Sequence, residues 1–206
     1  MRHFIAISGN IGVGKSTLTE RLAAELGWQA YFEPVTENPY LADFYGDMKR
    51  WAFHSQLFFL SHRLREHAAL TRSKNSIIQD RSVYENAEVF AKNLYQQGHI
   101  SERDWATYWN LYQTFMHELP APNLIIYLKA SVPVLQKRIV DRGRAFEKTI
   151  ETSYLETLNK LHDDWVTSFR QAPVLTIDTD AIDFNTDKIA IATLARRIKK
   201  ELHADD

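Results

Sequence analysis

The residues with the clearest chemical potential form one short stretch near the N-terminus. Residues 9–16 read Gly-Asn-Ile-Gly-Val-Gly-Lys-Ser, which fits the phosphate-binding P-loop pattern G-x-x-x-x-G-K-[ST]. In such a loop the glycines let successive backbone N–H groups curl around an anion. The helix that follows directs its positive end at the same point. We expect Lys15 to hold the β- and γ-phosphates of a nucleotide and the Ser16 hydroxyl to take a position on Mg²⁺.

The elements around this stretch have the order that a working phosphate loop requires. Residues 3–8 are apolar and rich in β-branched side chains, as in a buried strand. After the loop, Leu18, Leu22 and Leu26 recur at helical spacing, and Gly27 stands where a helix would end. The alternative is a tight strand-to-helix turn with an incidental lysine, and the flanking strand and helix make that alternative the weaker one.

Charged side chains follow two more predicted strands at the point where each strand ends. Glu33 follows the strand predicted at 28–32, and Asp80 and Arg81 follow the strand predicted at 75–79. Ligands of open α/β sheets bind at the carboxyl ends of the strands, so these side chains are expected beside the phosphate loop. Glu33 is a candidate general base, with a solvated charge before a proline turn as the alternative. Asp80 could bind Mg²⁺, and Arg81 could contact phosphate oxygens.

A second interpretation of the segment after Asp80 is structural and compatible with the first. Ser82 followed by Glu85 is a capping box that would begin a helix at about residue 83 and leave Asp80 and Arg81 free. That helix, to about residue 97, would carry Asn86 and Phe90 on one face. A long helix predicted at about 48–71 would likewise carry Gln56 and Arg63 on one face, although ordinary helix surface is the simpler reading of both.

Four cations gather on the helix predicted after the fourth strand: Lys137, Arg138, Arg142 and Arg144. They could be a solvated helix end. In a chain that holds a phosphate loop, they indicate a lid whose arginines reach the transferring phosphate.

Composition limits what else the chain could be. The 206 residues include 25 basic and 26 acidic side chains, a formal net charge of -1. This balance gives no electrostatic reason to expect binding to nucleic-acid polymers or membranes. There is no cysteine, which excludes disulfides, zinc–thiolate sites and thiol catalysis. We expect no signal peptide, no membrane span and a cytoplasmic location. Further strands at 122–128 and 174–177, and helices at about 101–119, 150–169 and from 182 onward, predict one α/β domain with a parallel, doubly wound sheet.

In combination these stretches resemble the deoxynucleoside kinases of the deoxycytidine/deoxyguanosine kinase family, closest to its bacterial deoxyadenosine/deoxyguanosine kinase branch. The resemblance covers nearly the whole chain. Its motifs are Gly9–Ser16, Glu33-Pro34-Val35, Trp51-Ala52-Phe53-His54-Ser55-Gln56, Asp80-Arg81-Ser82 and Arg142-Gly143-Arg144. It implies a P-loop kinase fold over residues 1–206: three αβα layers, a five-stranded parallel sheet in the order 2-3-1-4-5, and an Arg-rich lid at about 138–149.

The resemblance also assigns roles. It implies ATP as phosphate donor, held by Gly9, Asn10, Ile11, Gly12, Val13, Gly14, Lys15, Ser16, Thr17 and Arg144, with the donor adenine near residues 178–183. It implies Mg²⁺ near Ser16 and Asp80. It implies Glu33 as the base that takes the proton of the nucleoside 5′-OH, with Arg81, Arg138 and Arg142 acting on the phosphate. It implies sugar contacts from Tyr45 and Glu147, base contacts from Gln56, Arg63, Asn86 and Phe90, and a homodimer through the long helices.

Asn86 departs from the family pattern, which usually has Asp paired to the base-reading Arg. An amide both donates and accepts, so Asn86 could present a bidentate edge to adenine. It also leaves Arg63 less compensated, which could favour guanine O6. The two arguments pull in opposite directions; the resemblance to the bacterial branch implies a purine, with adenine or guanine left open.

Three functions remain as alternatives: a P-loop kinase of a nucleoside monophosphate, a pyrimidine deoxynucleoside kinase, and a non-catalytic nucleotide-binding protein. A monophosphate acceptor needs extra cations near Glu33, yet the neighbouring charges are Glu37 and Asp43. Lys15, Glu33, Asp80, Arg81 and Arg142 together argue against a non-catalytic role.

Overall fold

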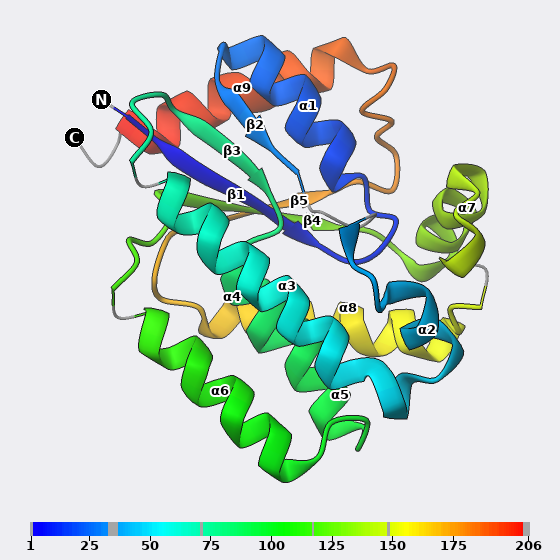
Figure 1. Ribbon diagram of the computed structural model, residues 1–206. Helices are drawn as coiled ribbons and strands as arrows, with labels where there is room; N and C mark the ends of the chain where they lie inside the picture. Colours follow the sequence, from blue (N-terminus) through cyan, green and yellow to red (C-terminus); the bar gives the residue numbers. More distant parts are fainter. Residues whose placement is uncertain (1, 33–36, 71, 117, 148, 204–206) are drawn as a thin grey trace.

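Five parallel strands form the centre of the protein. The structure, a computed structural model, describes residues 2–32, 37–70, 72–116, 118–147 and 149–203. The strands pair in the order β2-β3-β1-β4-β5, which confirms the predicted order (Figure 1). Their bounds are β1 Phe4–Gly9, β2 Gln29–Tyr31, β3 Ile77–Asp80, β4 Leu124–Lys129 and β5 Val174–Asp178.

Helices cover both faces of this sheet and make three layers (Figure 1). On one face lie α1 (Lys15–Leu26) and α9 (Lys188–His203), which contact each other. The other face carries α3 (Met48–Leu70), the segment from α4 (Val83–Glu85) to α5 (Lys92–Gln96), α6 (Glu102–Met116) and α8 (Thr152–Ser168). Two smaller pieces stand at the carboxyl edge: α2 (Leu41–Gly46), and α7 (Val132–Arg142) followed by η3 (Ala145–Glu147).

The layers follow from the alternation of side chains along the strands. Ile5 and Ile7 of β1 point into the core beneath α1 and α9, whereas Ala6 between them belongs to the core beneath α3 to α8. All three are fully buried. Strands buried on both faces read as continuous apolar runs, which is why β1 and β4 were predictable from sequence.

Two predicted helices differ from those observed. The helix expected over 83–97 contains a π-helical turn, η2 (Asn86–Ala91), between α4 and α5. A π turn inserts extra backbone into a helix and occurs often at functional sites, and no periodicity rule marks it in advance. The last helix begins at Lys188 and not at Ile182, because Asp183 accepts hydrogen bonds from the backbone N–H and side-chain amide of Asn185 and holds a turn.

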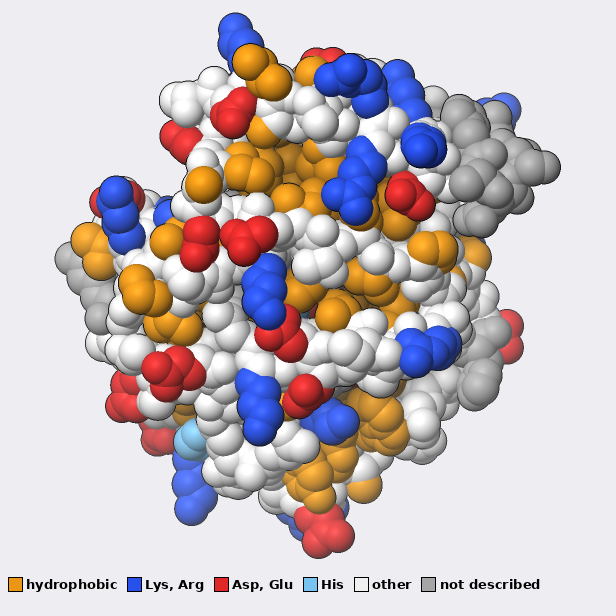
Figure 2. Space-filling model, turned by 180° about the vertical axis from the view of Figure 1, so that it is seen from behind, with side chains coloured by type: hydrophobic (Ala, Val, Ile, Leu, Met, Phe, Trp, Pro, Cys, Tyr) orange, Lys and Arg blue, Asp and Glu red, His pale blue; other side chains and the backbone are white. Residues whose placement is uncertain are grey.

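The surface agrees with the near-neutral composition. On the face shown in Figure 2, Lys and Arg side chains are interspersed with Asp and Glu. Within the described residues, no helix combines the length and the apolar character needed to cross a membrane.

Candidate active site

One large cavity lies at the carboxyl edge of the sheet. Its volume is about 730 Å³, within the range of small-molecule sites. The loop after β1, the end of β3 and the loop after β5 contribute to its wall, as do α2, α3 and the lid region. Predicted site residues that line it are Ile11, Gly12, Val13, Gly14, Lys15, Ser16, Thr17, Tyr45, Gln56, Asp80, Arg81, Asn86, Phe90, Arg138, Arg142, Arg144 and Glu147.

Hydrogen bonds from buried side chains fix the conformation of the phosphate loop. Lys15 is buried, and its Nζ donates to the carbonyls of Gly9 and Asn10, each at 2.8 Å. Asn10 is buried under the loop, where its Nδ2 donates to the carbonyl of Leu155 at 2.9 Å. Gly12 has a positive φ of 82°, and a Cβ there would lie 2.8 Å from Cγ1 of Ile139 on α7. Glycine is therefore required at this position, both for the backbone angle and for the contact of the loop with the lid helix.

Ser16 and Asp80 meet at the edge of the cavity. The Ser16 hydroxyl donates to Oδ2 of Asp80, which is 2% exposed. Both side chains offer oxygen, the ligand that Mg²⁺ prefers, and Mg²⁺ commonly binds through one or two carboxylates together with substrate phosphates. Among the described residues there is no cluster of three or more His, Cys, Asp or Glu side chains for a metal. The donor set fits an ion that is completed by the phosphates of a nucleotide.

Arg81 is held in an unusual backbone conformation. Its φ of 66° is the only positive value outside glycine among the described residues, and such strain persists where the surrounding structure enforces it. Its backbone N–H donates to the Ile7 carbonyl at 2.8 Å, which extends the β1–β3 ladder by one bond. The guanidinium carbon lies 3.8 Å from the centre of the Phe90 ring. Arg81 thus stands at the junction of the phosphate loop and the aromatic wall of the cavity.

Glu85 is a candidate functional residue, although the capping-box pattern gave it only a role at the start of a helix. Ser82 does cap the helix, because its hydroxyl accepts from the Glu85 N–H at 3.1 Å. The Glu85 carboxylate instead accepts from the Gly9 N–H at 2.9 Å and lies 2.8 Å from Nε2 of His162. Burial raises the pKa of this carboxyl, but Arg81, His162 and Lys15 outweigh it and lower the pKa to about 2. Glu85 is therefore an anion beneath the phosphate loop.

Two arginines of the predicted lid converge on one carboxylate. Nη2 of Arg142 lies 2.6 Å from Oε2 of Glu147, and Nη1 of Arg144 lies 3.3 Å from Oε1 of the same residue. Glu147 is 4% exposed, whereas each arginine is about one-third exposed. Arg142 and Arg144 are therefore held on a carboxylate that lines the cavity. The three-residue spacing of Arg144 and Glu147 could have suggested one of these pairs, whereas the five-residue spacing of Arg142 and Glu147 could not.

Arg138 has a different set of partners from the other lid arginines. It donates to the carbonyl of Val13 in the phosphate loop, and to the hydroxyl and carbonyl of Thr179 and the carbonyl of Ile182 in the loop after β5. It braces these two loops against each other. Its predicted action on the transferring phosphate stays a prediction, since it would require some of these bonds to be exchanged.

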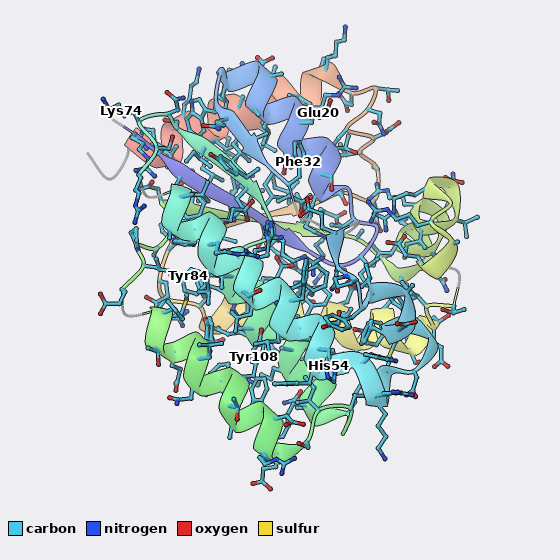
Figure 3. All side chains as sticks on the ribbon, in the orientation of Figure 1. Glu20, Phe32, His54, Lys74, Tyr84 and Tyr108 are labelled. Atoms are coloured by element: carbon cyan, nitrogen blue, oxygen red, sulfur yellow. The ribbon has the colours of Figure 1, made fainter. Side chains whose placement is uncertain are left out.

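The far end of the cavity is aromatic and amide-lined. Phe44, Tyr45, Phe59 and Phe90 contribute rings, and Gln56 and Asn86 contribute carboxamides. Nδ2 of Asn86 lies 3.4 Å from the hydroxyl of Tyr108 on α6, which is labelled in Figure 3. Flat apolar walls with a few polar groups suit a planar heterocycle.

Arg63 does not line this cavity. It is fully buried in α3 and pairs with Glu66, so its charge has a carboxylate partner although an amide stands at position 86. Its contact with the base stays a prediction. The spacing of Arg63 and Glu66, three apart on a helix, could have revealed the pair.

Two further sequence predictions concern the edges of the site. Glu33, with Pro34 and Val35, lies outside the described residues, so its role as base stays a prediction. The loop predicted to hold the donor adenine does border the cavity, through Asp180, Ala181, Ile182, Asp183, Phe184 and Asn185.

One cavity at the edge of a parallel sheet is lined by a phosphate loop with its lysine and serine, by an adjacent aspartate and by several arginines. This combination defines the class of P-loop phosphotransferases. Within that class the chain belongs to the deoxynucleoside kinase family, whose sequence model, described as "Deoxynucleoside kinase", matches residues 5–203.

Named proteins are similar in sequence to this chain over nearly its full length. The chain is 38% identical to a deoxyguanosine kinase of Bacillus subtilis, over 96% of each protein. It is 35% identical to a deoxyadenosine/deoxycytidine kinase of the same organism, over 97% of this chain and 93% of the relative. Among solved structures, a deoxyadenosine kinase from M. mycoides with bound dATP superimposes with a TM-score of 0.80 at 30% identity, over 97% of this chain and 100% of the other. The predicted family and fold are confirmed.

Proposed function

We propose that this kinase transfers the γ-phosphoryl group of ATP to the 5′-OH of a purine 2′-deoxynucleoside. The observation that carries the proposal is the shared cavity: the phosphate loop, the lid and the aromatic, amide-lined end border one space. A donor phosphate and an acceptor alcohol can therefore meet without leaving the protein. In-line phosphoryl transfer needs mainly such positioning and the stabilisation of charge.

The residues divide this work by position. Lys15 and the backbone N–H groups of residues 12–16 bind the β- and γ-phosphates, and Arg142, Arg144 and Arg81 supply charge around the transferring group. Mg²⁺, held by Ser16 and Asp80, would neutralise phosphate charge when bound. Glu33 accepts the proton of the 5′-OH, and Tyr45 and Glu147 bind the 3′-OH.

The purine preference is supported by the relatives and by the cavity. Several relatives are named as deoxyadenosine or deoxyguanosine kinases, although one is also named for deoxycytidine. The amides of Gln56 and Asn86 offer both donors and acceptors to a base edge, and the ring of Phe90 lies beside them in the cavity wall. A nucleoside monophosphate acceptor is less well served, because the charged side chains that follow Glu33 in the sequence are the carboxylates of Glu37 and Asp43.

The proposal is tested by a coupled assay of ADP formation over a panel of deoxynucleosides, deoxynucleoside monophosphates and no acceptor. We expect turnover with deoxynucleosides, purines first, and none with monophosphates. Glu33→Gln should lower kcat by about 10³-fold and leave nucleoside affinity largely intact, because only the proton acceptor is lost. ADP formation that is independent of acceptor, or equal rates in mutant and parent, would remove the proposed reaction or the proposed base.

The setting of the enzyme is part of the same proposal. We place it in the cytoplasm, where ATP is available, and propose a homodimer through the long helices α3 and α6, which pack side by side (Figure 1). Phe115 on α6 is 40% exposed, which supports a partner surface there. Sedimentation analysis of the wild-type protein and of Phe115→Lys tests this pairing.

A further inference from the structure

Helix α8 supports the first two residues of the phosphate loop through one of its faces. Nδ2 of Asn10 donates to Oδ1 of Asn159 on α8 at 2.8 Å. His162 follows three residues later on the same face of the helix and reaches the loop through Glu85. Oε1 of Glu85 accepts from the Gly9 N–H at 2.9 Å and lies 2.8 Å from Nε2 of His162. A helix distant in the chain is thus connected to the loop by a buried histidine and a buried carboxylate.

The imidazole of His162 faces an acceptor at each of its two nitrogens. The side chain has an exposure of 0%, and Nδ1 lies 2.7 Å from the carbonyl of Leu158 while Nε2 faces Oε1 of Glu85. A carbonyl oxygen only accepts, so Nδ1 carries a hydrogen, and Nε2 shares a second proton with the carboxylate. Because Glu85 is an anion, this proton lies on Nε2. His162 is therefore the side-chain donor that holds Glu85.

Two aromatic rings fix the direction of this donor. The Tyr127 ring is stacked on the imidazole, with centroids 5.9 Å apart and an angle of 6° between the planes. The Phe90 ring meets the imidazole edge-on at 5.5 Å and 79°. Phe90 lines the cavity, whereas His162 does not. The imidazole can therefore act on a bound nucleotide only through other residues.

Glu85 also feels two cations that line the cavity. Arg81 and Lys15 act electrostatically on its carboxylate together with His162, and both border the space where donor phosphates are expected. A buried charge that loses one partner is costly unless other groups compensate it. Without the imidazole, Glu85 would draw Lys15 and Arg81 more strongly and would compete with a bound phosphate for them. With His162 in place, much of this compensation comes from a residue that does not line the cavity.

We propose that His162, by donating to Glu85, keeps Lys15 and Arg81 directed at the donor phosphates and so sets the affinity of the phosphate loop for ATP. The inference rests on the proposed function and deepens it at the donor end. His162 is a positioning residue, because it acts through Glu85 and touches no atom of the nucleotide.

The first test measures the Kd of ATP by calorimetry, with Mg²⁺ and without nucleoside, in the wild type and in His162→Phe. Phenylalanine keeps a ring beside Tyr127 and Phe90 but removes both N–H groups. The Kd and the KM of ATP should rise at least about tenfold, as expected for the loss of a hydrogen bond to a charged group, whereas the KM of the deoxynucleoside should change by less than about threefold. His67→Phe is the matched control and should bind ATP as the wild type does. His67 is also buried, its Nε2 lies 2.7 Å from the carbonyl of Pro120, and it does not line the cavity.

A double variant separates this role from simple packing. In Glu85→Gln the side-chain oxygen can still accept from the Gly9 N–H, but no charge remains to draw the cations. Adding His162→Phe to Glu85→Gln should therefore change the Kd of ATP by less than about threefold. The double variant contains no unpaired buried carboxylate, so it keeps the proposal testable if His162→Phe alone does not fold.

Three results would overturn the proposal: an unchanged Kd of ATP in folded His162→Phe, an equal loss in His67→Phe, or a loss of tenfold or more when His162→Phe is added to Glu85→Gln. A wild-type protein that binds ATP but phosphorylates no deoxynucleoside would refute the proposed function alone, because ATP binding is measured without an acceptor.

Discussion

The two ends of the cavity hold their charges in opposite ways. At the donor end, the cations line the cavity and are bound to groups that a phosphate can replace: Lys15 to two backbone carbonyls, and Arg142 and Arg144 to Glu147. Towards the acceptor end, Arg63 is fully buried on Glu66 and does not line the cavity, and Arg81 stands over the Phe90 ring at the boundary between the two ends.

The contrast follows from the ligands. A triphosphate brings several negative charges, so cations on exchangeable partners lose little when the protein is empty and gain much when it is loaded. A nucleoside base brings none, so a loose cation beside it would only add a desolvation penalty. The donor end is therefore built to change its contacts on binding, and the acceptor end to keep them.

The largest effect is expected when a cation at the donor end, the lysine of the phosphate loop, is removed. Lys15→Met should lower kcat by about 10²- to 10³-fold, because a preorganised donor to the transferring phosphate is lost. Deoxynucleoside affinity, measured by calorimetry without ATP, should change by less than about threefold. Lys129→Met is the control, since Lys129 pairs with Asp163 on an exposed part of the surface. A large loss of nucleoside affinity in Lys15→Met would show that the two ends are not independent.

The donor end of the cavity could be predicted from the sequence more completely than the acceptor end. The P-loop is a local motif whose geometry is fixed by Gly12, Gly14 and Lys15 within a few residues, so its place on β1 and α1 followed directly. Most strand bounds also followed, because buried parallel strands are continuous apolar runs, whereas the order of the strands in the sheet was implied by the family resemblance.

What could not be predicted depends on contacts between segments distant in the chain. Glu85 looked like a cap, but its carboxylate finds Gly9 and His162, which lie 76 and 77 residues away. The π turn at Asn86 breaks the helical period that placed Asn86 and Phe90 on one face, although both still line the cavity. The pairing of Arg63 also involves a distant element, because its partner Glu66 accepts a second hydrogen bond from Gln79 of β3.

Glu147 allows a finer test of how the two ends of the cavity differ, because this carboxylate is involved at both. This carboxylate holds Arg142 and Arg144, and it is also the predicted partner of the sugar 3′-OH. Nucleoside binding would then draw Glu147 away from the arginines and release them to the donor phosphate. Glu147→Gln should therefore lower kcat/KM for a 2′-deoxynucleoside by about tenfold, the loss of a charge-assisted hydrogen bond.

A double cycle with a 2′,3′-dideoxynucleoside isolates the sugar contact. The dideoxynucleoside lacks the 3′-OH, so the wild type should use it about tenfold less well, and Glu147→Gln should distinguish the two substrates by less than about threefold. Equal discrimination by both enzymes would show that Glu147 serves the lid and not the sugar.

The smallest expected effect lies beneath the donor end, at Glu85, and appears in stability. A pKa of about 2 in the folded protein, below the ordinary 4.5, means that the unfolded chain takes up the proton first as pH falls. The stabilisation from ionised Glu85 is therefore complete above pH 4.5 and is lost as pH falls from there towards 2. Its full size is on the order of 3 kcal/mol. In Glu85→Gln this part of the pH dependence should disappear from urea unfolding curves taken between pH 6 and pH 3.

The comparison with Glu102→Gln decides whether that acid dependence belongs to the buried anion. Glu102 is exposed at the start of α6, so its variant should keep the wild-type slope of unfolding free energy against pH. If Glu85→Gln also keeps that slope, the carboxyl is protonated in the folded protein at moderate pH and cannot be the counter-charge for Lys15 and Arg81. If the slope is lost but kcat at neutral pH falls by less than about threefold, the Gly9 N–H and the lysine keep their places without the anion. In that case the backbone of the loop alone is sufficient to preorganise the donor end.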